Sequence, residues 1–272
     1  MEFYINSKFE VNHYRFYSDK VSRDVRLAVL ADLHNCMCED GGRQLFHVIE
    51  GEEPDVIVLA GDMVNSVNGT DMKPVMEFIK LLNEHYPVIY GVGNHERKVL
   101  EGTCLFAERR AFAEGLKHSG VRLLSNAHKN LWDSGIRISC LDLPLKYFRR
   151  HDHLPLEVSD LYEMLGEPDR RYFNVLIAHD PQYFLTYSEY GPEVILSGHM
   201  HGGVIRFPFL GGFISPKLRL FPRYTSGSFE RKGSKMIVSK GLGMHTIKVR
   251  VNNPTELVIA DITGAKDNGK QS

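Results

Sequence analysis

Five short runs of Val, Ile, Leu and Ala are spaced along the first 200 residues, and few polar residues interrupt them. Because the runs barely alternate between apolar and polar positions, they predict strands buried on both faces, as in a parallel sheet. Amphipathic stretches at 43–50, 73–84 and 103–118 place apolar residues at helical spacing between the runs. This alternation predicts an α/β fold. The five runs cover 25–31, 55–60, 87–92, 172–178 and 193–197.

The pattern changes after the third helical stretch. Four later segments read as short strands separated by turns: 121–142, 235–240, 245–251 and 256–262. They predict a second sheet that packs on the first. No internal repeat or long linker divides the chain, so we expect residues 1–263 to form a single domain. The remaining residues, 264–272, predict a polar C-terminal tail.

Composition excludes several classes of protein. The 33 Lys and Arg residues nearly balance the 34 Asp and Glu residues, whereas a protein that binds nucleic acid over its whole surface is much more basic. We therefore expect no nucleic-acid partner, and no obligate protein partner is evident. Four scattered cysteines predict reduced thiols. Neither a signal peptide nor a stretch of ~20 apolar residues is present, so the expected location is the cytoplasm.

Residues of the kind that bind metals follow each of the five runs. Because the carboxyl ends of parallel strands form one rim, where ligands bind, we expect these side chains to meet there. Carboxylate, amide and imidazole groups suit Mn, Fe or Zn. Each motif alone also fits a capped loop or a structural histidine, but five in order favour a metal site. The residues are, in chain order, Asp32, His34, Asp62, Asn94, His95, His179, His199 and His201.

These residues stand in five motifs along the chain: Asp32-x-His34, Gly61-Asp62, Gly93-Asn94-His95-Glu96, His179 and Gly198-His199-x-His201. The ordered set resembles the calcineurin-like metallophosphoesterase superfamily over roughly residues 25–262. Residues 199–208 and 239–243 resemble a narrower bacterial branch, which includes membrane-associated phosphodiesterases and hydrolases of lipid-linked pyrophosphates. The resemblance implies a four-layer α/β/β/α sandwich with two mixed β-sheets flanked by helices.

The resemblance also implies a role for each motif residue and a cofactor of two divalent metal ions, Mn, Fe or Zn. Asp62 would bridge the two metals and His95 would sit beside the scissile phosphate, which makes both of them catalytic residues. Many relatives carry a second acidic residue shortly after the Gly-Asp motif, whereas Asn65 is nearby here, so the partner of His95 stays open. The first metal would be held by Asp32, His34 and His201, and the second by Asn94, His179 and His199.

The expected function is a metal-dependent phosphoester hydrolase, either a phosphodiesterase or a pyrophosphohydrolase that uses a metal-bridging hydroxide. His95 would protonate the leaving group or stabilise the transition state. A phosphomonoesterase or a nuclease with the same site is the alternative within the enzyme class. A non-catalytic scaffold of the same fold is the alternative outside it.

The substrate is expected to be a phosphorylated small molecule or a lipid-linked compound. Residues 206–223 are apolar with interspersed Lys and Arg, which suits peripheral contact with an anionic membrane. The same segment also fits a loop that packs on its own domain. Asn94, His95 and Arg206 are the predicted substrate contacts. Residues 144–153 could form a basic wall of the site or an ordinary solvated charge run.

Overall fold

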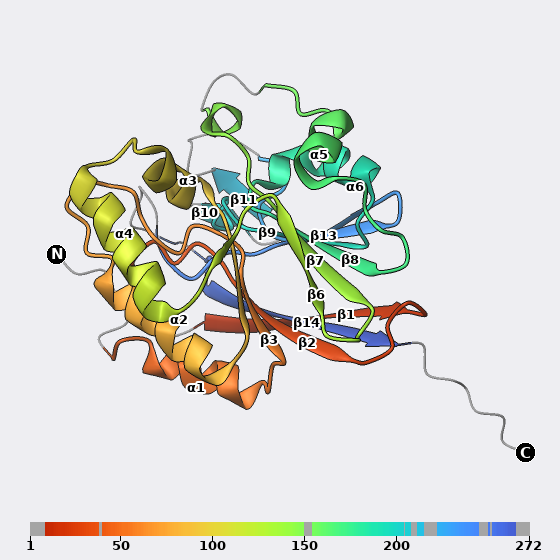
Figure 1. Ribbon diagram of the computed structural model, residues 1–272, viewed down its shortest axis with the longest axis horizontal. Coiled ribbons are helices and arrows are strands. Elements are labelled where there is room, and N and C mark those ends of the chain that lie inside the picture. The colour runs from red at the N-terminus through yellow and green to blue at the C-terminus, as the bar shows by residue number, and fades with distance from the viewer. Residues whose placement is uncertain are drawn as a thin grey trace, which may run out of the picture.

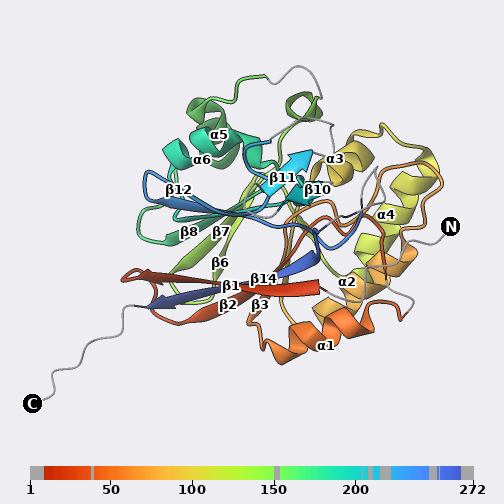
Figure 2. The ribbon, with the colours of Figure 1, turned by 180° about the vertical axis from the view of Figure 1, so that it is seen from behind.

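Two β-sheets pack face to face in the computed structural model, and helices cover the outer face of each sheet (Figures 1 and 2). The structure describes residues 9–37, 40–149, 154–203, 205–207, 211–214, 222–244, 250 and 252–264. The predicted α/β fold, with two mixed sheets flanked by helices in four layers, is confirmed.

The first sheet has six strands and is mixed. Its central strands run parallel, and they are the first three apolar runs of the sequence. The last strand of the chain enters antiparallel to the first of these runs and parallel to the N-terminal strand. The spatial order is β1 (Phe9–Ser18), β14 (Thr255–Gly264), β2 (Val25–Leu30), β3 (Val56–Leu59), β4 (Val88–Gly91) and β5 (Leu123–Leu124).

The second sheet also has six strands, and only its two edge strands run antiparallel to their neighbours. A separate two-stranded ribbon joins β10 (Ile205–Phe207) to β11 (Gly211–Ile214). The spatial order of the large sheet is β12 (Gly227–Arg231), β13 (Ser234–Val238), β9 (Val194–Ser197), β8 (Phe173–Ala178), β7 (Ile136–Leu141) and β6 (Ala127–Leu131).

The distribution of strands corrects the expectation of one rim. The first three apolar runs lie in one sheet, but β8 and β9 lie in the other, so two sheets rather than one supply the motif residues. The later segments are also divided, because 235–240 overlaps β13 of the second sheet and 256–262 lies within β14 of the first. Hydrophobic patterning predicts that a strand is buried, whereas the choice of neighbour depends on tertiary contacts.

The three predicted helices are present as α1 (Arg43–Gly51), α2 (Lys73–His85) and α4 (Phe106–Ser119). Three shorter helices were not predicted: α3 (Asn94–Glu101), α5 (Val158–Leu165) and α6 (Phe184–Tyr190). Each is only two turns long, which is too short for a clear periodic signal. Within the ranges given above, no helix combines the length and the apolar composition that a membrane span requires.

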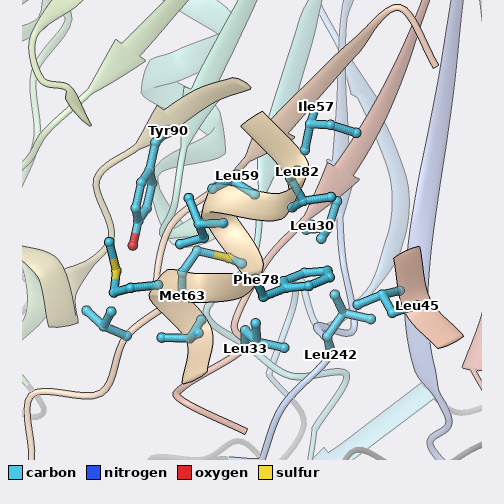
Figure 3. Close-up of a cluster of buried hydrophobic side chains, with 14 of the residues drawn as sticks. Leu30, Leu33, Leu45, Ile57, Leu59, Met63, Phe78, Leu82, Tyr90 and Leu242 are labelled. Atoms are coloured by element: carbon cyan, nitrogen blue, oxygen red, sulfur yellow. The ribbon is translucent and has the colours of Figure 1, made fainter. Parts of the chain in front are cut away.

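Three apolar clusters fill the spaces between the layers: helix to first sheet, sheet to sheet, and second sheet to helix. In the first cluster, Phe78 of α2 and Leu45 of α1 point toward the sheet (Figure 3). Leu33 and Leu242 meet them there, although both come from loops beyond strand ends. The core therefore also holds the loops that carry the motif residues.

Two earlier predictions fall partly on undescribed residues. The predicted strand 245–251 lies outside the described residues except for Arg250. The predicted tail begins at Gly264, which is the last residue of β14, and residues 265–272 lie outside the described residues.

Candidate metal centre

The carboxyl ends of β2, β3, β4, β8 and β9 point at one place between the two sheets. Three overlapping groups of Asp and His side chains meet there, and in each group the possible ligand atoms lie within 4.8 Å of one another. All the Asp and His residues singled out in the sequence belong to these groups, so the structure brings them together. The first group is Asp32, His34 and His201, and the second is Asp62, His179 and His199; a third group, His34, Asp62 and His95, overlaps both.

The backbone at these residues is unusual. Asp32, His34, Asp62, His199 and His201 all have positive φ, between 50° and 68°. They are five of the eleven non-glycine residues with positive φ in the described part of the chain. This left-handed conformation costs about 1–3 kcal/mol per residue and gathers where surrounding contacts impose it, often at functional sites. The pairs two residues apart therefore reach the site through tight turns, and not through the alternation of an extended strand.

The first group brings three possible ligand atoms face to face. His34 Nε2 and His201 Nε2 are 3.0 Å apart, and their rings stack with centroids 4.8 Å apart. Asp32 Oδ1 lies 3.3 Å from His201 Nε2 and 3.7 Å from His34 Nε2. Two imidazole nitrogens and a carboxylate that converge in this way form a donor set suited to a divalent cation.

In the second group, the orientation of His179 is set by the main chain. Its Nδ1 lies 2.8 Å from the carbonyl oxygen of Ala60, so Nδ1 carries a proton and donates it. Its Nε2 then faces Asp62 Oδ2 at 3.1 Å and Asp32 Oδ1 at 3.7 Å. Within the described residues this buried Nε2 makes no hydrogen bond of regular geometry. A lone pair that faces two carboxylates needs a proton or a metal ion between them.

The electrostatics of this pair agree with that geometry. Burial alone would lower the pKa of His179, but the negative charge of Asp62 outweighs it and raises that pKa to about 10. Burial would raise the pKa of Asp62, yet the imidazoles of His179, His95 and His34 hold it well below its usual value. The site is strongly attractive to positive charge, whether a proton or a metal supplies it.

Asn94 completes the second group. One atom of its side-chain amide lies 2.7 Å from His199 Nδ1 and 3.2 Å from Asp62 Oδ2. If this atom is the amide nitrogen, it would donate to both neighbours. If it is the carbonyl oxygen, it faces two acceptors. A cation bound by Asn94, His199 and Asp62 together would explain why the carbonyl oxygen faces two acceptors. The donor set therefore fits a metal here as well.

Asp62 lies between the first and second groups. Its Oδ2 is 3.1 Å from His179 Nε2 on one side and 3.9 Å from His34 Nε2 on the other. Its Oδ1 accepts a hydrogen bond of 2.8 Å from the backbone N–H of His95, in the first turn of α3. One carboxylate therefore faces both groups while a helix N-terminus holds its other oxygen.

His95 has a partner that the sequence left open. Its Nδ1 accepts a 2.9 Å hydrogen bond from the backbone N–H of Ser66 and lies 2.9 Å from Ser66 Oγ. Asn65 is not that partner, because its side-chain oxygen accepts from the N–H of Val67. In the neutral ring the proton must then sit on Nε2, which leaves an N–H donor on the side of the ring away from Ser66.

Glu96 and Asp180 support the site and were given no role from the sequence. The buried Glu96 carboxylate accepts hydrogen bonds from the N–H groups of Asp62, Val64 and Gly93, at 2.8 to 3.1 Å, and from the Tyr90 hydroxyl at 2.8 Å. Asp180 Oδ2 lies 3.7 Å from His199 Nε2. A carboxylate behind a ligating imidazole orients the ring.

The signal for Glu96 was present in the sequence. It stands three residues after Gly93 at the start of α3, the position of an acidic capping residue. Asp180 directly follows His179, but nothing in the local pattern indicates which histidine it approaches.

Replacing Glu96 with Gln is expected to destabilise the protein by about 2–4 kcal/mol, because the new NH₂ group would face N–H donors. Chemical denaturation monitored by circular dichroism measures this change. Glu114→Gln is the matched control, since Glu114 is an exposed residue that pairs with Arg110 on the surface of α4. Equal free energies of unfolding for the Glu96 variant and the control would contradict the supporting role.

Three predictions from the sequence concern segments near the site that lie partly outside the described residues. Arg206 lies in β10, but its side chain is outside the described part, as are residues 208–210 and 215–221 of the predicted membrane-facing segment. In the predicted basic wall, residues 145–148 form a short 3₁₀ helix, η1 (Leu145–Phe148), and 150–153 lie outside the described residues. The Phe148 ring lies with its centroid 5.8 Å from that of His199.

Two sheets whose strand ends bring together Asp, Asn and His side chains define a protein with a candidate site for divalent metal ions. The model of the calcineurin-like phosphoesterase family matches residues 25–203. The chain therefore belongs to the calcineurin-like phosphoesterase family, and it is a metal-dependent phosphoesterase.

Three relatives illustrate the range of this family. The chain is 27% identical to an uncharacterized metallophosphoesterase of Campylobacter jejuni, over 90% of this chain, and it spans only 61% of that protein's length. It is 24% identical to the Escherichia coli phosphodiesterase YaeI, over 61% of this chain and 55% of YaeI. It is 20% identical to the UDP-2,3-diacylglucosamine pyrophosphatase LpxG of Chlamydia muridarum, over 86% of this chain and 82% of LpxG.

Proposed function

We propose that this protein hydrolyses a phosphodiester or a pyrophosphate with two divalent cations, Mn, Fe or Zn, bound side by side. The observation that carries the proposal is the position of Asp62, whose Oδ2 faces His34 on one side and His179 on the other. A carboxylate shared in this way is what a two-metal site requires. A single-metal site would leave one of the two groups of buried ligands without a cation.

Each metal has its own ligands in this proposal. Asp62 belongs to both sites. When bound, the two cations supply an activated water and neutralise charge that develops on the phosphate. The first site comprises Asp32, His34 and His201, and the second comprises Asn94, His179 and His199.

His95 has a separate role. Hydrolysis joins a water oxygen to phosphorus, breaks the bond from phosphorus to the leaving oxygen, and returns a proton to that oxygen. Because the Ser66 N–H occupies Nδ1, His95 can direct its Nε2–H at the reacting phosphate. This geometry favours hydrogen bonding to the transition state, one of the two roles considered from the sequence. Asn94 would contact the same phosphate while it holds the second metal.

Two relatives and one apolar neighbour of the site support a substrate class. YaeI is named as a phosphodiesterase and LpxG as a pyrophosphatase of a diacylated sugar nucleotide. Phe148, which is partly buried, places an aromatic ring beside His199 at the second metal site. A diester or pyrophosphate with an apolar substituent fits this surface better than a bare phosphomonoester. Peripheral membrane contact through 206–223, with Arg206 as a substrate contact, belongs to the same proposal.

A substrate panel tests the proposal. The purified protein is assayed with Mn on bis(p-nitrophenyl) phosphate, on UDP-2,3-diacylglucosamine and on p-nitrophenyl phosphate. We expect Mn-dependent hydrolysis of the diester or the pyrophosphate, with the monoester slower. The fastest turnover on the monoester would favour a phosphomonoesterase with the same site. Activity on none of the three would contradict the proposed chemistry.

Removal of the metals is expected to lower stability as well as activity. With free Mn at about 100 times its dissociation constant, each site stabilises the folded protein by about 2.7 kcal/mol. Dialysis against EDTA should therefore lower the thermal midpoint by several degrees, and added Mn should restore it. Differential scanning fluorimetry measures this shift. An unchanged midpoint would indicate that the buried ligands hold no metal.

A further inference from the structure

The turn formed by residues 239–243 lies directly behind Asp32. It follows β13 in the second sheet, yet it bonds to the loop that follows β2 in the first sheet. The N–H of Leu242 donates to the carbonyl of Ala31 at 3.0 Å, and the N–H of Gly243 donates to the carbonyl of Asp32 at 2.8 Å. On the other side, the N–H of Ser239 donates to the carbonyl of Ser197 in β9 at 2.9 Å. The turn thus connects both sheets at the metal centre.

Two glycines of this turn have no room for a side chain. A Cβ at Gly243 would lie 2.1 Å from the carbonyl oxygen of Leu33 and 2.7 Å from that of Asp32. A Cβ at Gly241, whose φ is +71°, would lie 2.7 Å from the Cβ of Asp32. Both obstacles are parts of the Asp32–His34 loop, and neither is the flexible end of a side chain. The turn and the ligand loop are therefore in direct backbone contact.

The turn is held from behind by the core and by two charged residues. Leu242 is fully buried and packs with Leu33 in the core between the first sheet and its helices (Figure 3). The Arg250 guanidinium donates through Nη2 to the carbonyl oxygens of Gly241 and Gly243. The buried Glu256 carboxylate accepts from the N–H of Lys240 at 2.7 Å. A turn held at these points cannot move without moving the loop in front of it.

We propose that the turn 239–243 is a positioning element for Asp32 and His34, and so controls the affinity of the first metal site. The inference rests on the proposed two-metal function. Asp32 must keep its left-handed backbone to face His201 while its carboxylate also accepts from the N–H of His199. Ligands tolerate displacements of only about 0.5 Å. The second site has further supports that the turn does not contact, namely the Ala60 carbonyl behind His179 and Glu96 behind the shared Asp62.

Calorimetric titration of the metal-free protein with MnCl₂ tests this inference. The wild type is expected to bind two ions. Gly243→Ala should keep one site near its original affinity and weaken the other at least about tenfold, the range found for residues that orient ligands. Gly51→Ala is the matched control, because a Cβ there meets nothing within 4 Å and the residue ends α1. The control should bind both ions as the wild type does.

Two ligand variants identify the weakened site. His201→Ala removes a ligand of the first site, so adding Gly243→Ala should change Mn binding little further. Asn94→Ala removes a ligand of the second site, so adding Gly243→Ala should weaken the remaining site at least about tenfold. Arg250→Gln, which leaves both glycines in place, provides a milder variant if Gly243→Ala does not fold. It should weaken the same site by a smaller factor.

The outcomes separate this inference from the proposed function. If the wild type fails to bind two Mn ions, the two-metal proposal is wrong. If the wild type binds two ions, and folded Gly243→Ala or Arg250→Gln binds them with unchanged affinity, the positioning role is overturned. Equal weakening of both sites would also overturn it, because the turn would then act on the whole fold.

Discussion

Replacing Asp62 with Ala is expected to remove both metal ions and to reduce hydrolysis of a phosphodiester to the background rate. Its carboxylate Oδ2 faces both ligand groups, at 3.1 Å from His179 Nε2 and 3.9 Å from His34 Nε2. Without it, buried imidazoles would lose the negative charge that attracts a cation to each site. Elemental analysis of the purified variant, together with turnover at saturating Mn, measures both effects.

Asp62→Asn separates the charge of this residue from its shape. The amide can keep one oxygen for the N–H of His95, so the fold should be retained while metal binding falls. Asp133→Asn, at an exposed turn, is the control and should keep both metals and full activity. An Asp62→Ala protein that retained two metals and measurable turnover would contradict the bridging role.

The second large effect is expected at His95. His95→Asn should lower kcat by about 10²–10⁴, the usual contribution of a group that donates or transfers a proton in the transition state. KM should change little, because the metals and Asn94 would still bind the phosphate. The physical reason is the loss of the Nε2–H, because the hydrogen bond from Ser66 to Nδ1 places the proton of the neutral ring on Nε2. Steady-state kinetics on a chromogenic phosphodiester measure the two parameters separately.

Metal content decides between two roles for His95. One of its ring nitrogens also lies within 4.8 Å of possible ligand atoms of His34 and Asp62, so it could hold a metal itself. If His95→Asn loses a metal ion, His95 is a ligand; if both metals remain and kcat falls, it acts on the substrate. His118→Asn is the control, because His118 is an exposed residue that pairs with Glu77 on the helix surface. Its variant should match the wild type in both measurements.

The helices and strands that the sequence predicted share one property. Each is long or strongly patterned, as in α2, where Val75, Phe78, Ile79 and Leu82 are all buried. The two-turn helices α3, α5 and α6 were missed because so few positions establish no period. The strand content near 235–240 and 256–262 was predicted, but the division of these strands between two sheets was not. The hydrophobic pattern of a strand predicts that it is buried, but it does not predict which strand lies beside it.

The Asp and His residues of the metal centre could be identified from the sequence because each directly follows a buried strand. A strand end is a local feature, and the parallel strands of one sheet bring their carboxyl ends to the same edge. The packing of the two sheets then decides that both edges meet at one site. The contacts that support these residues could not be identified in the same way. Ser66 reaches His95 from a separate loop, and Glu96, near Gly93 in one segment, also binds the N–H groups of Asp62 and Val64 in another. Such contacts exist only after the chain has packed.

The sequence alone determined the kinds of ligand, their order and their places at strand ends, since these depend on residue type and local hydrophobic pattern. Only the tertiary structure decided that the ligands come from two sheets, that Asp62 faces both groups, and that Ser66 holds the ring of His95. Only packing placed Gly241 and Gly243 against the Asp32 loop, because that contact joins residues more than 200 positions apart. No local pattern carries that information, since the energy of such a contact depends on the whole core around it.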